Sequence, residues 1–296
     1  MIISFSRRSG TGVRHPVNPC SMIAKLSFIP LLTMLTAATL AGNTAHAAMS
    51  DWANNEGGRM RLVALAPDAQ GHIRAGLQIE PAPGWITYWR EPGESGIPPQ
   101  VSPAPDSGVT LEKTSYPTPK PITVGTIQEI GYDAPVTLPL DFRVGGNPPA
   151  TLHLTAFIGL CKDICIPFQT EFSLPLAPAA QSTAHEQALL DAANASLPQA
   201  PSADFAIEDH RLLADAKTLS LRLTLPEAAG SAPSIYVTGP AGYVFFKQAN
   251  GIRAGKTFST DIAIGKLPKN YDIKGKSWGV LVIDGERAME TTLAFE

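Results

Sequence analysis

The sequence predicts an all-β protein: an antiparallel β-sandwich followed by a second, smaller β domain. Three observations support this. Short runs of alternating apolar and polar residues recur along the chain, and prolines and glycines separate them. Such runs at short intervals are typical of antiparallel sandwiches. The pattern is interrupted at residues 177–203, which are rich in alanine and proline and indicate a break between two domains.

The first domain is expected at residues 48–178. Its alternating runs lie at residues 60–65, 72–79, 85–89, 136–142, 152–158 and 166–176. The third run contains Trp85, Tyr88 and Trp89, which would suit a sugar-binding platform if they were exposed. Packing in the core of a sandwich explains these aromatic side chains more simply.

The clearest element of this domain is a hairpin that carries two of the three cysteines. Pairing its strands across a turn at residues 162–164 places Cys161 opposite Cys165. In this register apolar residues of both strands share one face and mostly polar residues share the other, with Phe157 as the exception. Opposed Cα atoms lie about 4.5–5.5 Å apart, within the range of about 4.4–6.8 Å that a disulfide accepts. The sequence therefore predicts a Cys161–Cys165 disulfide at the tip of the hairpin.

Residues 179–203 are expected to form a linker with a short helix at 182–197. Ser182 or Thr183 would be its N-cap, and Glu186 the acid of the capping box. The second domain is expected at residues 204–296, with strand-like runs at 219–225, 234–238, 243–247, 257–262, 278–283 and 289–295. It contains no cysteine and one histidine, His210, so a structural or partner-binding role is expected for it.

Residues 1–47 have the features of an export signal. Basic residues precede an apolar run at 26–41, and Ala45-His46-Ala47 matches a small-x-small cleavage site. A transmembrane anchor is the alternative, but this run has 16 residues and contains Pro30, whereas roughly 20 residues are needed to cross a bilayer. We therefore expect export, with cleavage near Ala47 and loss of Cys20.

The composition of the remaining chain excludes several classes of function. Without the four basic residues of the signal, it has 19 basic and 26 acidic residues, a net charge of −7. This charge gives no support to binding of nucleic acid or anionic membranes. Two cysteines in an exported protein favour a disulfide over a structural zinc site. The sequence has no motif typical of serine hydrolases, zinc proteases or phosphate-binding loops, and no cofactor or resident metal is expected.

Three stretches of the first domain resemble the amino-terminal periplasmic domain of DsbD-type thiol:disulfide interchange proteins, and most closely the ScsB-like branch associated with copper tolerance. They are residues 84–90 (GWITYWR), 131–140 (GYDAPVTLPL) and 161–168 (CKDICIPF). The resemblance covers residues 50–177, and its specific part is the cysteine hairpin that ends in a proline.

The resemblance implies an immunoglobulin-like sandwich in the periplasm whose cysteine pair cycles between disulfide and dithiol. In the family, the pair takes electrons from a membrane-embedded thiol reductant and passes them to periplasmic thioredoxin-fold proteins. A cap loop shields the pair between encounters, and by position it lies within residues 116–121 and their continuation to residue 130. By analogy, Cys165 is the attacking thiol of the reduced form. The residues expected to surround the pair are Tyr88, Tyr116, Pro117, Tyr132, Lys162 and Asp163.

The chain also departs from the best-known members of the family. It has three residues between the cysteines where they have five, and Thr114-Ser115 where they carry acidic residues before the cap aromatics. It lacks the transmembrane electron channel and the thioredoxin domain, so its reductant is expected to be a separate protein. The nearby acidic residues are expected to be solvated loop charges; they are Glu91, Glu94, Glu129 and Asp133.

Two alternatives to a thiol:disulfide oxidoreductase fit the same cysteine pair. The first is a disulfide-stapled binding or assembly module. However, stabilisation by a disulfide grows with loop length, from about 3 kcal/mol at roughly 15 residues, so this short loop gains little. The second is a Cu(I)-binding copper-tolerance protein, because Cu(I) prefers sulfur ligands. His153 is a poor additional ligand, since it lies eight positions from Cys161, roughly 26 Å along a strand.

Overall fold

The computed structural model describes residues 49–296 except 94–95, 125–126, 148, 177–183, 214–216, 227–231, 241–243, 246 and 266. The export signal and the N-cap predicted at Ser182 or Thr183 lie outside the described residues. Strands dominate the described chain, which has one helix, and this confirms the all-β prediction. None of the described residues forms a helix long and apolar enough to span a membrane.

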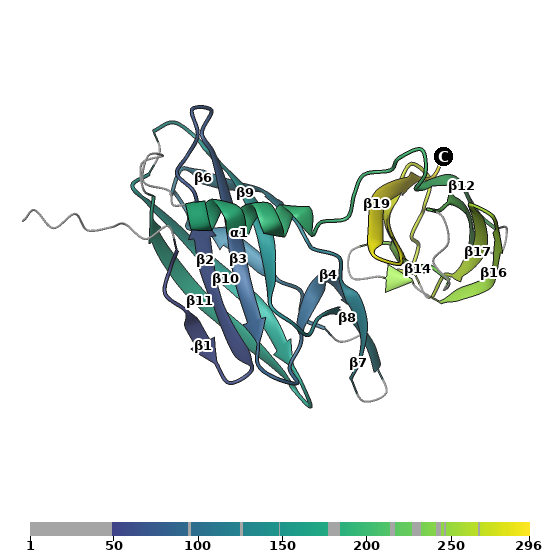
Figure 1. Cartoon of the computed structure of the whole chain (residues 1–296), viewed down its shortest axis with the longest axis horizontal. Helices are drawn as coiled ribbons and strands as arrows, with labels where there is room; N and C mark the ends of the chain where they lie inside the picture. Colours follow the sequence, from purple (N-terminus) through teal and green to yellow (C-terminus); the bar gives the residue numbers. More distant parts are fainter. Residues whose placement is uncertain are drawn as a thin grey trace, which may run out of the picture. The chain divides into compact units, whose positions relative to one another are not determined.

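Residues 53–175 form three antiparallel sheets (Figure 1). The largest has the strand order β1 (Ala53–Asn55), β2 (Gly58–Ala64), β3 (His72–Pro81), β9 (Val136–Val144) and β6 (Val109–Thr114). The second has the order β11 (Cys165–Pro175), β10 (Thr151–Cys161) and β5 (Gln100–Pro103). The third has the order β4 (Thr87–Gly93), β8 (Ile127–Tyr132) and β7 (Lys120–Val124).

The core of this sandwich is formed by the inward faces of the two larger sheets. On β10, Leu152, Leu154, Ile158 and Leu160 are almost fully buried, while His153 between them is exposed. This alternation is the one predicted from the sequence, because a strand with one covered face buries every second side chain. Trp89 is fully buried in the same cluster, so the aromatic run belongs to the core and does not form an exposed platform.

The cysteine hairpin has the predicted register. Its strands β10 and β11 pair continuously from Thr151 opposite Pro175 to Cys161 opposite Cys165. A one-residue slip would turn every apolar side chain of a strand to the other face, so the core fixes this register. The position of the two cysteines at the tip follows from that constraint.

The cap region differs from expectation. Residues 116–130 were expected to form a loop, but strands β7 and β8 pair there, from Lys120 opposite Gly131 to Val124 opposite Ile127. Prolines at residues 117, 119 and 121 mask this hairpin in the sequence, because proline normally indicates a loop. Pro121 is tolerated since β7 is the edge strand of its sheet, where a missing N–H costs no ladder hydrogen bond.

The predicted helix forms as α1 (Ala184–Ala195) and lies against the sheet that contains β3 and β9 (Figure 1). Its buried Leu190 fills the space above Gly76 of β3, where a Cβ atom would come within 2.8 Å of Leu190 Cδ2. Arg74 and Asp191 form an ion pair of 2.6 Å beside this contact. A glycine in the strand therefore allows the helix to approach closely.

Residues 206–294 form two four-stranded antiparallel sheets with their own apolar cluster around the buried Trp278. One has the order β12 (Ala206–Leu212), β13 (Thr218–Thr224), β17 (Thr257–Ala263) and β16 (Gln248–Ala254). The other has the order β15 (Val244–Phe245), β14 (Ser234–Thr238), β18 (Ser277–Asp284) and β19 (Arg287–Ala294). The domain boundaries at residues 178 and 204 stay a prediction.

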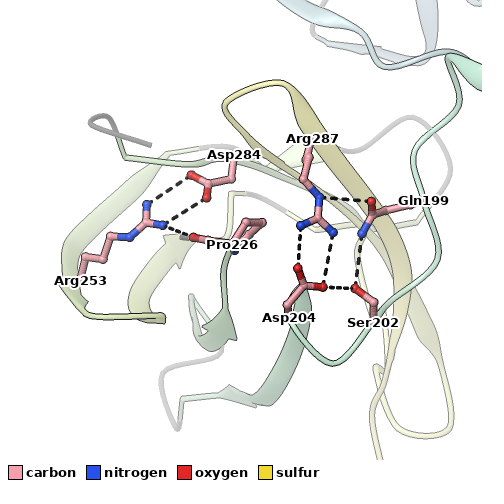
Figure 2. Close-up of polar contacts among 7 residues, drawn as sticks. All are labelled: Gln199, Ser202, Asp204, Pro226, Arg253, Asp284 and Arg287. Atoms are coloured by element: carbon pink, nitrogen blue, oxygen red, sulfur yellow. Dashed lines mark hydrogen bonds and ion pairs between the residues drawn. The ribbon is translucent and has the colours of Figure 1, made fainter. Parts of the chain in front are cut away.

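Two arginine networks flank the turn between β18 and β19 (Figure 2). Arg253 of β16 donates through both terminal nitrogens to the carboxylate of Asp284, at 3.3 and 3.2 Å, and to the Pro226 carbonyl at 2.8 Å. The Asp284 side chain is only 1% exposed. On the other strand, Arg287 pairs with Asp204 at 2.7 Å. The first network joins the two sheets, because β16 and β18 belong to different ones.

Candidate redox site

The candidate site is the tip of the β10–β11 hairpin. Cys161 is the last residue of β10, Cys165 is the first of β11, and their sulfurs form a disulfide with the Cα atoms 4.1 Å apart. Within the loop, the Lys162 N–H donates to the Ile164 carbonyl at 3.2 Å. The bridge therefore joins two residues that the strand register already places opposite each other.

The two sulfurs lie in different surroundings. Cys161 is 1% exposed and packs in a small cluster with Ile86, Tyr88 and Ile122. Its backbone is also fixed, because it exchanges hydrogen bonds with Ile86 at 2.8 and 3.0 Å. Cys165, in contrast, is exposed. An attacking thiolate from another molecule can therefore approach the Cys165 sulfur more easily than the Cys161 sulfur.

Tyr88 contacts the exposed cysteine from the protein side. Its side chain is 1% exposed, and its hydroxyl oxygen lies 3.3 Å from Cys165 Sγ. A disulfide sulfur carries no hydrogen, so the hydroxyl donates. Burial, and secondly the nearby charge of Glu129, raise the pKa of Tyr88 to about 12. The phenol therefore keeps its proton at neutral pH and remains a donor to sulfur.

Close packing against glycines fixes the position of the Tyr88 ring. A Cβ atom at Gly96 would lie 2.6 Å from its Cε1, and one at Gly159 would lie 3.1 Å from its Cδ2. At Gly131, opposite Tyr88 in the β4–β8 ladder, a Cβ would collide with the Thr87 carbonyl oxygen. Three segments can thus approach the ring and its backbone only because they lack a side chain at these points.

Glu129 lies close to this arrangement, and the expectation that it is a solvated loop charge is wrong. It is 2% exposed and lies on β8, the central strand of its sheet, whereas the preceding residue Gln128 is exposed. Glu91 is partly buried and Asp133 is exposed, whereas Glu94 lies outside the described residues.

The other residues expected around the pair occupy two places. Lys162 and Asp163 are exposed in the loop between the cysteines, and the Lys162 side chain lies against Gly84. Tyr132 donates to the Pro117 carbonyl at 2.7 Å, and Tyr116 donates to the Pro99 carbonyl at 3.5 Å.

Burial is the main cause that raises the pKa of both tyrosines, to about 12 for Tyr116. Among the described contacts, these two tyrosines bond to backbone carbonyls and not to the cysteines. In the cap region, Ile122 is the described residue that packs against the cluster containing Cys161.

In the described part of the chain, no three or more histidine, cysteine, aspartate or glutamate side chains are grouped so that they could hold a metal ion. His153 is within hydrogen-bond distance of Ser173 across the hairpin, at 2.9 Å.

Residues 60–177 match the sequence profile of the family described as thiol:disulfide interchange protein DsbD, N-terminal. This segment is therefore similar to the DsbD amino-terminal family. The chain is also similar to the crystal structure of the N-terminal periplasmic domain of ScsB from Proteus mirabilis, with a TM-score of 0.69 and 24% sequence identity. The alignment covers 84% of this chain and 98% of that one, and at this identity it shows a shared fold. No curated protein sequence matches the chain.

In this DsbD-like domain, sequence reasoning missed the residues that give the two cysteines different surroundings. Ile86 and Ile122 cover Cys161, and Gly96 and Gly159 close on Tyr88. Gly159 lies on β10 itself, but Ile86, Gly96 and Ile122 come from other parts of the chain, and their proximity to the hairpin depends on how the sheets pack. The only signal in the sequence was the apolar character of Ile86 within the matching stretch 84–90.

A Tyr88→Phe variant tests the contact between the phenol and the Cys165 sulfur. After reduction, we expect its Cys165 to react about five- to tenfold more slowly with iodoacetamide at pH 7. The reason is that a hydrogen bond from the phenol stabilises the thiolate, which is the reactive form. Tyr132→Phe is the matched control, because that hydroxyl bonds a backbone carbonyl. Equal rates for Tyr88→Phe and the unchanged protein would contradict a role for the phenol.

Proposed function

We propose that this protein is a periplasmic thiol:disulfide exchange protein. Its Cys161–Cys165 disulfide accepts electrons from a membrane-embedded thiol reductant and passes them to thioredoxin-fold proteins. One observation carries the proposal: the disulfide joins one exposed and one buried cysteine at the tip of a hairpin. Exchange requires an accessible sulfur that can be attacked and a second one that can leave and later return.

The reaction follows from this asymmetry. A thiolate of the reductant attacks Cys165 Sγ, a new S–S bond forms, and the old bond breaks with its electron pair moving to Cys161. The second thiolate of the reductant then attacks the reductant's first sulfur, which is bonded to Cys165 in the mixed disulfide. This attack releases Cys165 as a thiolate. The reductant leaves as a disulfide, and the two protons of its thiols balance the dithiol formed here.

The second half-reaction uses the same sulfur. The Cys165 thiolate attacks the disulfide of a thioredoxin-fold partner and forms a mixed disulfide with it. Cys161 then attacks Cys165 Sγ, which restores the Cys161–Cys165 bond and releases the partner as a dithiol. Tyr88 supports both half-reactions, because its O–H points to Cys165 and can stabilise negative charge when that sulfur is a thiolate.

A purely structural disulfide explains the arrangement less well. The bond closes a loop of three residues at the end of a ladder of eleven paired positions, so the hairpin is already held by its backbone hydrogen bonds and core. A bridge over so short a loop removes little entropy from the unfolded chain. An exposed sulfur is also a disadvantage for a permanent bond, because it allows exchange.

The periplasmic location is part of the proposal. It is supported by the apolar run and cleavage motif that end near Ala47. The similar ScsB structure is likewise described as a periplasmic domain. A location with an oxidising environment is the setting in which a disulfide in a small β domain persists.

The reduction potential of the pair tests the function. We expect a value above about −300 mV, because structural disulfides lie below that level and exchange-active ones lie above it. The measurement is equilibration with glutathione or dithiothreitol redox buffers, followed by alkylation and mass spectrometry. A potential below about −300 mV, together with no exchange with thioredoxin, would overturn the proposal in favour of a structural bridge.

A further inference from the structure

We infer that Ile164 is the docking contact for protein partners: its side chain packs into an apolar rim around the partner's reactive cysteine and so selects protein thiols over small ones. The inference rests on the proposed exchange function and adds to it the residue that recognises the partner. It concerns the chemistry of the partner surface, which must be apolar where it borders the reacting sulfur.

The first support is the exposure of Ile164 beside the attacked sulfur. Ile164 is 67% exposed and directly precedes the exposed Cys165. Pro167 is also exposed and lies on the same face of β11 as Cys165, two residues further on. Apolar groups therefore lie next to the sulfur both in the loop and along the strand.

Exposure alone would not carry the inference, because single exposed apolar side chains are common on protein surfaces. Ile252 is equally exposed, at 68%, but it lies on β16 and is not adjacent to a cysteine in the sequence. The position of Ile164 is what distinguishes it. A partner sulfur can bond to Cys165 Sγ only if the surrounding partner surface comes over the adjacent residues, and Ile164 is one of them.

The second support is that the loop is held in place before any partner arrives. The Lys162 N–H to Ile164 carbonyl hydrogen bond closes the loop, and the β10–β11 ladder pairs the residues on either side of it as far as Cys161 and Cys165. Behind it, the Thr87 hydroxyl donates to the Gly159 carbonyl at 3.0 Å in a buried position. A side chain presented on a fixed loop loses little conformational entropy on binding, which favours its use as a contact.

The third support is the charge of the loop. Lys162 and Asp163 are both exposed and have opposite charges, so the loop has no net charge. Electrostatic attraction therefore offers little to a partner at this point, and the apolar side chain is the main source of contact energy. We accordingly expect exchange with a protein partner to depend only weakly on salt.

The test compares Ile164→Ser with the unchanged full-length protein in two exchange reactions. The reduced protein reacts with oxidised thioredoxin in one and with glutathione disulfide in the other, and the second-order rate constants are measured by stopped flow. With thioredoxin we expect a roughly tenfold lower rate constant, as for losing most of the burial of one isoleucine. With glutathione disulfide, which is too small to cover the loop, we expect no change.

Two further variants serve as controls. Ile252→Ser removes an equally exposed isoleucine and is expected to leave both rates unchanged. Ile164→Leu keeps the apolar contact and is expected to retain most of the rate with thioredoxin.

The outcomes separate the inference from the function it rests on. The docking role would be overturned if Ile164→Ser left the rate constant with thioredoxin unchanged. It would also be overturned if the variant lowered the rate constants with thioredoxin and with glutathione disulfide equally. If the unchanged protein exchanges with neither reagent, the proposed function itself fails.

Discussion

Cys165→Ser is expected to abolish exchange with both thioredoxin and glutathione, because it removes the only sulfur of the pair that an outside thiolate can reach. Cys161→Ser is expected to behave differently. It keeps the exposed Cys165, which can still form a mixed disulfide, but it removes the sulfur that would resolve it. The single-cysteine variant should therefore accumulate as a covalent complex with its partner.

Non-reducing gel electrophoresis and mass spectrometry of the two reduced variants give the measurement, after incubation with a thioredoxin variant that keeps only its reactive cysteine, bonded to a labile thiol leaving group. A complex with Cys161→Ser and none with Cys165→Ser is the expected result. The reverse pattern would show that the buried sulfur is attacked first, and it would contradict the assignment made from exposure. The same Cys161→Ser variant expressed in the periplasm would identify the natural partners.

Asp284→Asn is expected to destabilise the protein by about 2–4 kcal/mol. Asp284 is almost completely buried and accepts two hydrogen bonds from Arg253 (Figure 2), whose side chain is 21% exposed. Removing the negative charge leaves a largely desolvated guanidinium without its counter-charge, which costs more than the pair contributes when intact. The Pro226 carbonyl still accepts a hydrogen bond from Arg253 in the variant. The loss of stability should therefore lie at the lower end of the range for broken buried ion pairs.

Urea unfolding followed by circular dichroism measures this loss. Glu80→Gln is the matched control, because Glu80 pairs with Arg59 in a cross-strand ion pair whose side chains are 30% and 45% exposed. Exposed pairs contribute about 0–1 kcal/mol, so this variant should be close to the unchanged protein. Similar destabilisation by both variants would mean that burial does not set the strength of the Asp284 pair.

The parts of the fold that could be predicted are strands that have one face against the core and the other face in solvent. In β10 and β11 the alternation of apolar and polar residues fixed both the strands and their register, and the cysteines followed from it. The hairpin of β7 and β8 could not be found in this way. Prolines obscure its first strand. In its second strand the charged Glu129 is buried while the neighbouring Gln128 is exposed, so the polar residues there do not mark one solvent-facing side.

The candidate site was predictable only in part, for a related reason. The cysteine pair and Tyr88 came from local spacing and from matching stretches of sequence. The difference between the two sulfurs depends on Ile86 and Ile122, which reach Cys161 from other strands. Such contacts depend on how the sheets pack, and this packing cannot be inferred from the residues next to the cysteines in the sequence. The exposure of Ile164 is likewise a property of the folded hairpin tip.

The long ladder behind the cysteines has a consequence for the lifetime of the complexes that this protein forms. Eleven paired positions keep the two cysteine backbones opposite each other whether or not their sulfurs are bonded. The effective concentration of Cys161 at a mixed disulfide on Cys165 therefore stays high, since the attack is intramolecular and the geometry is already in place. Partners should be released soon after they are captured, so in the unmodified protein each encounter is expected to be brief.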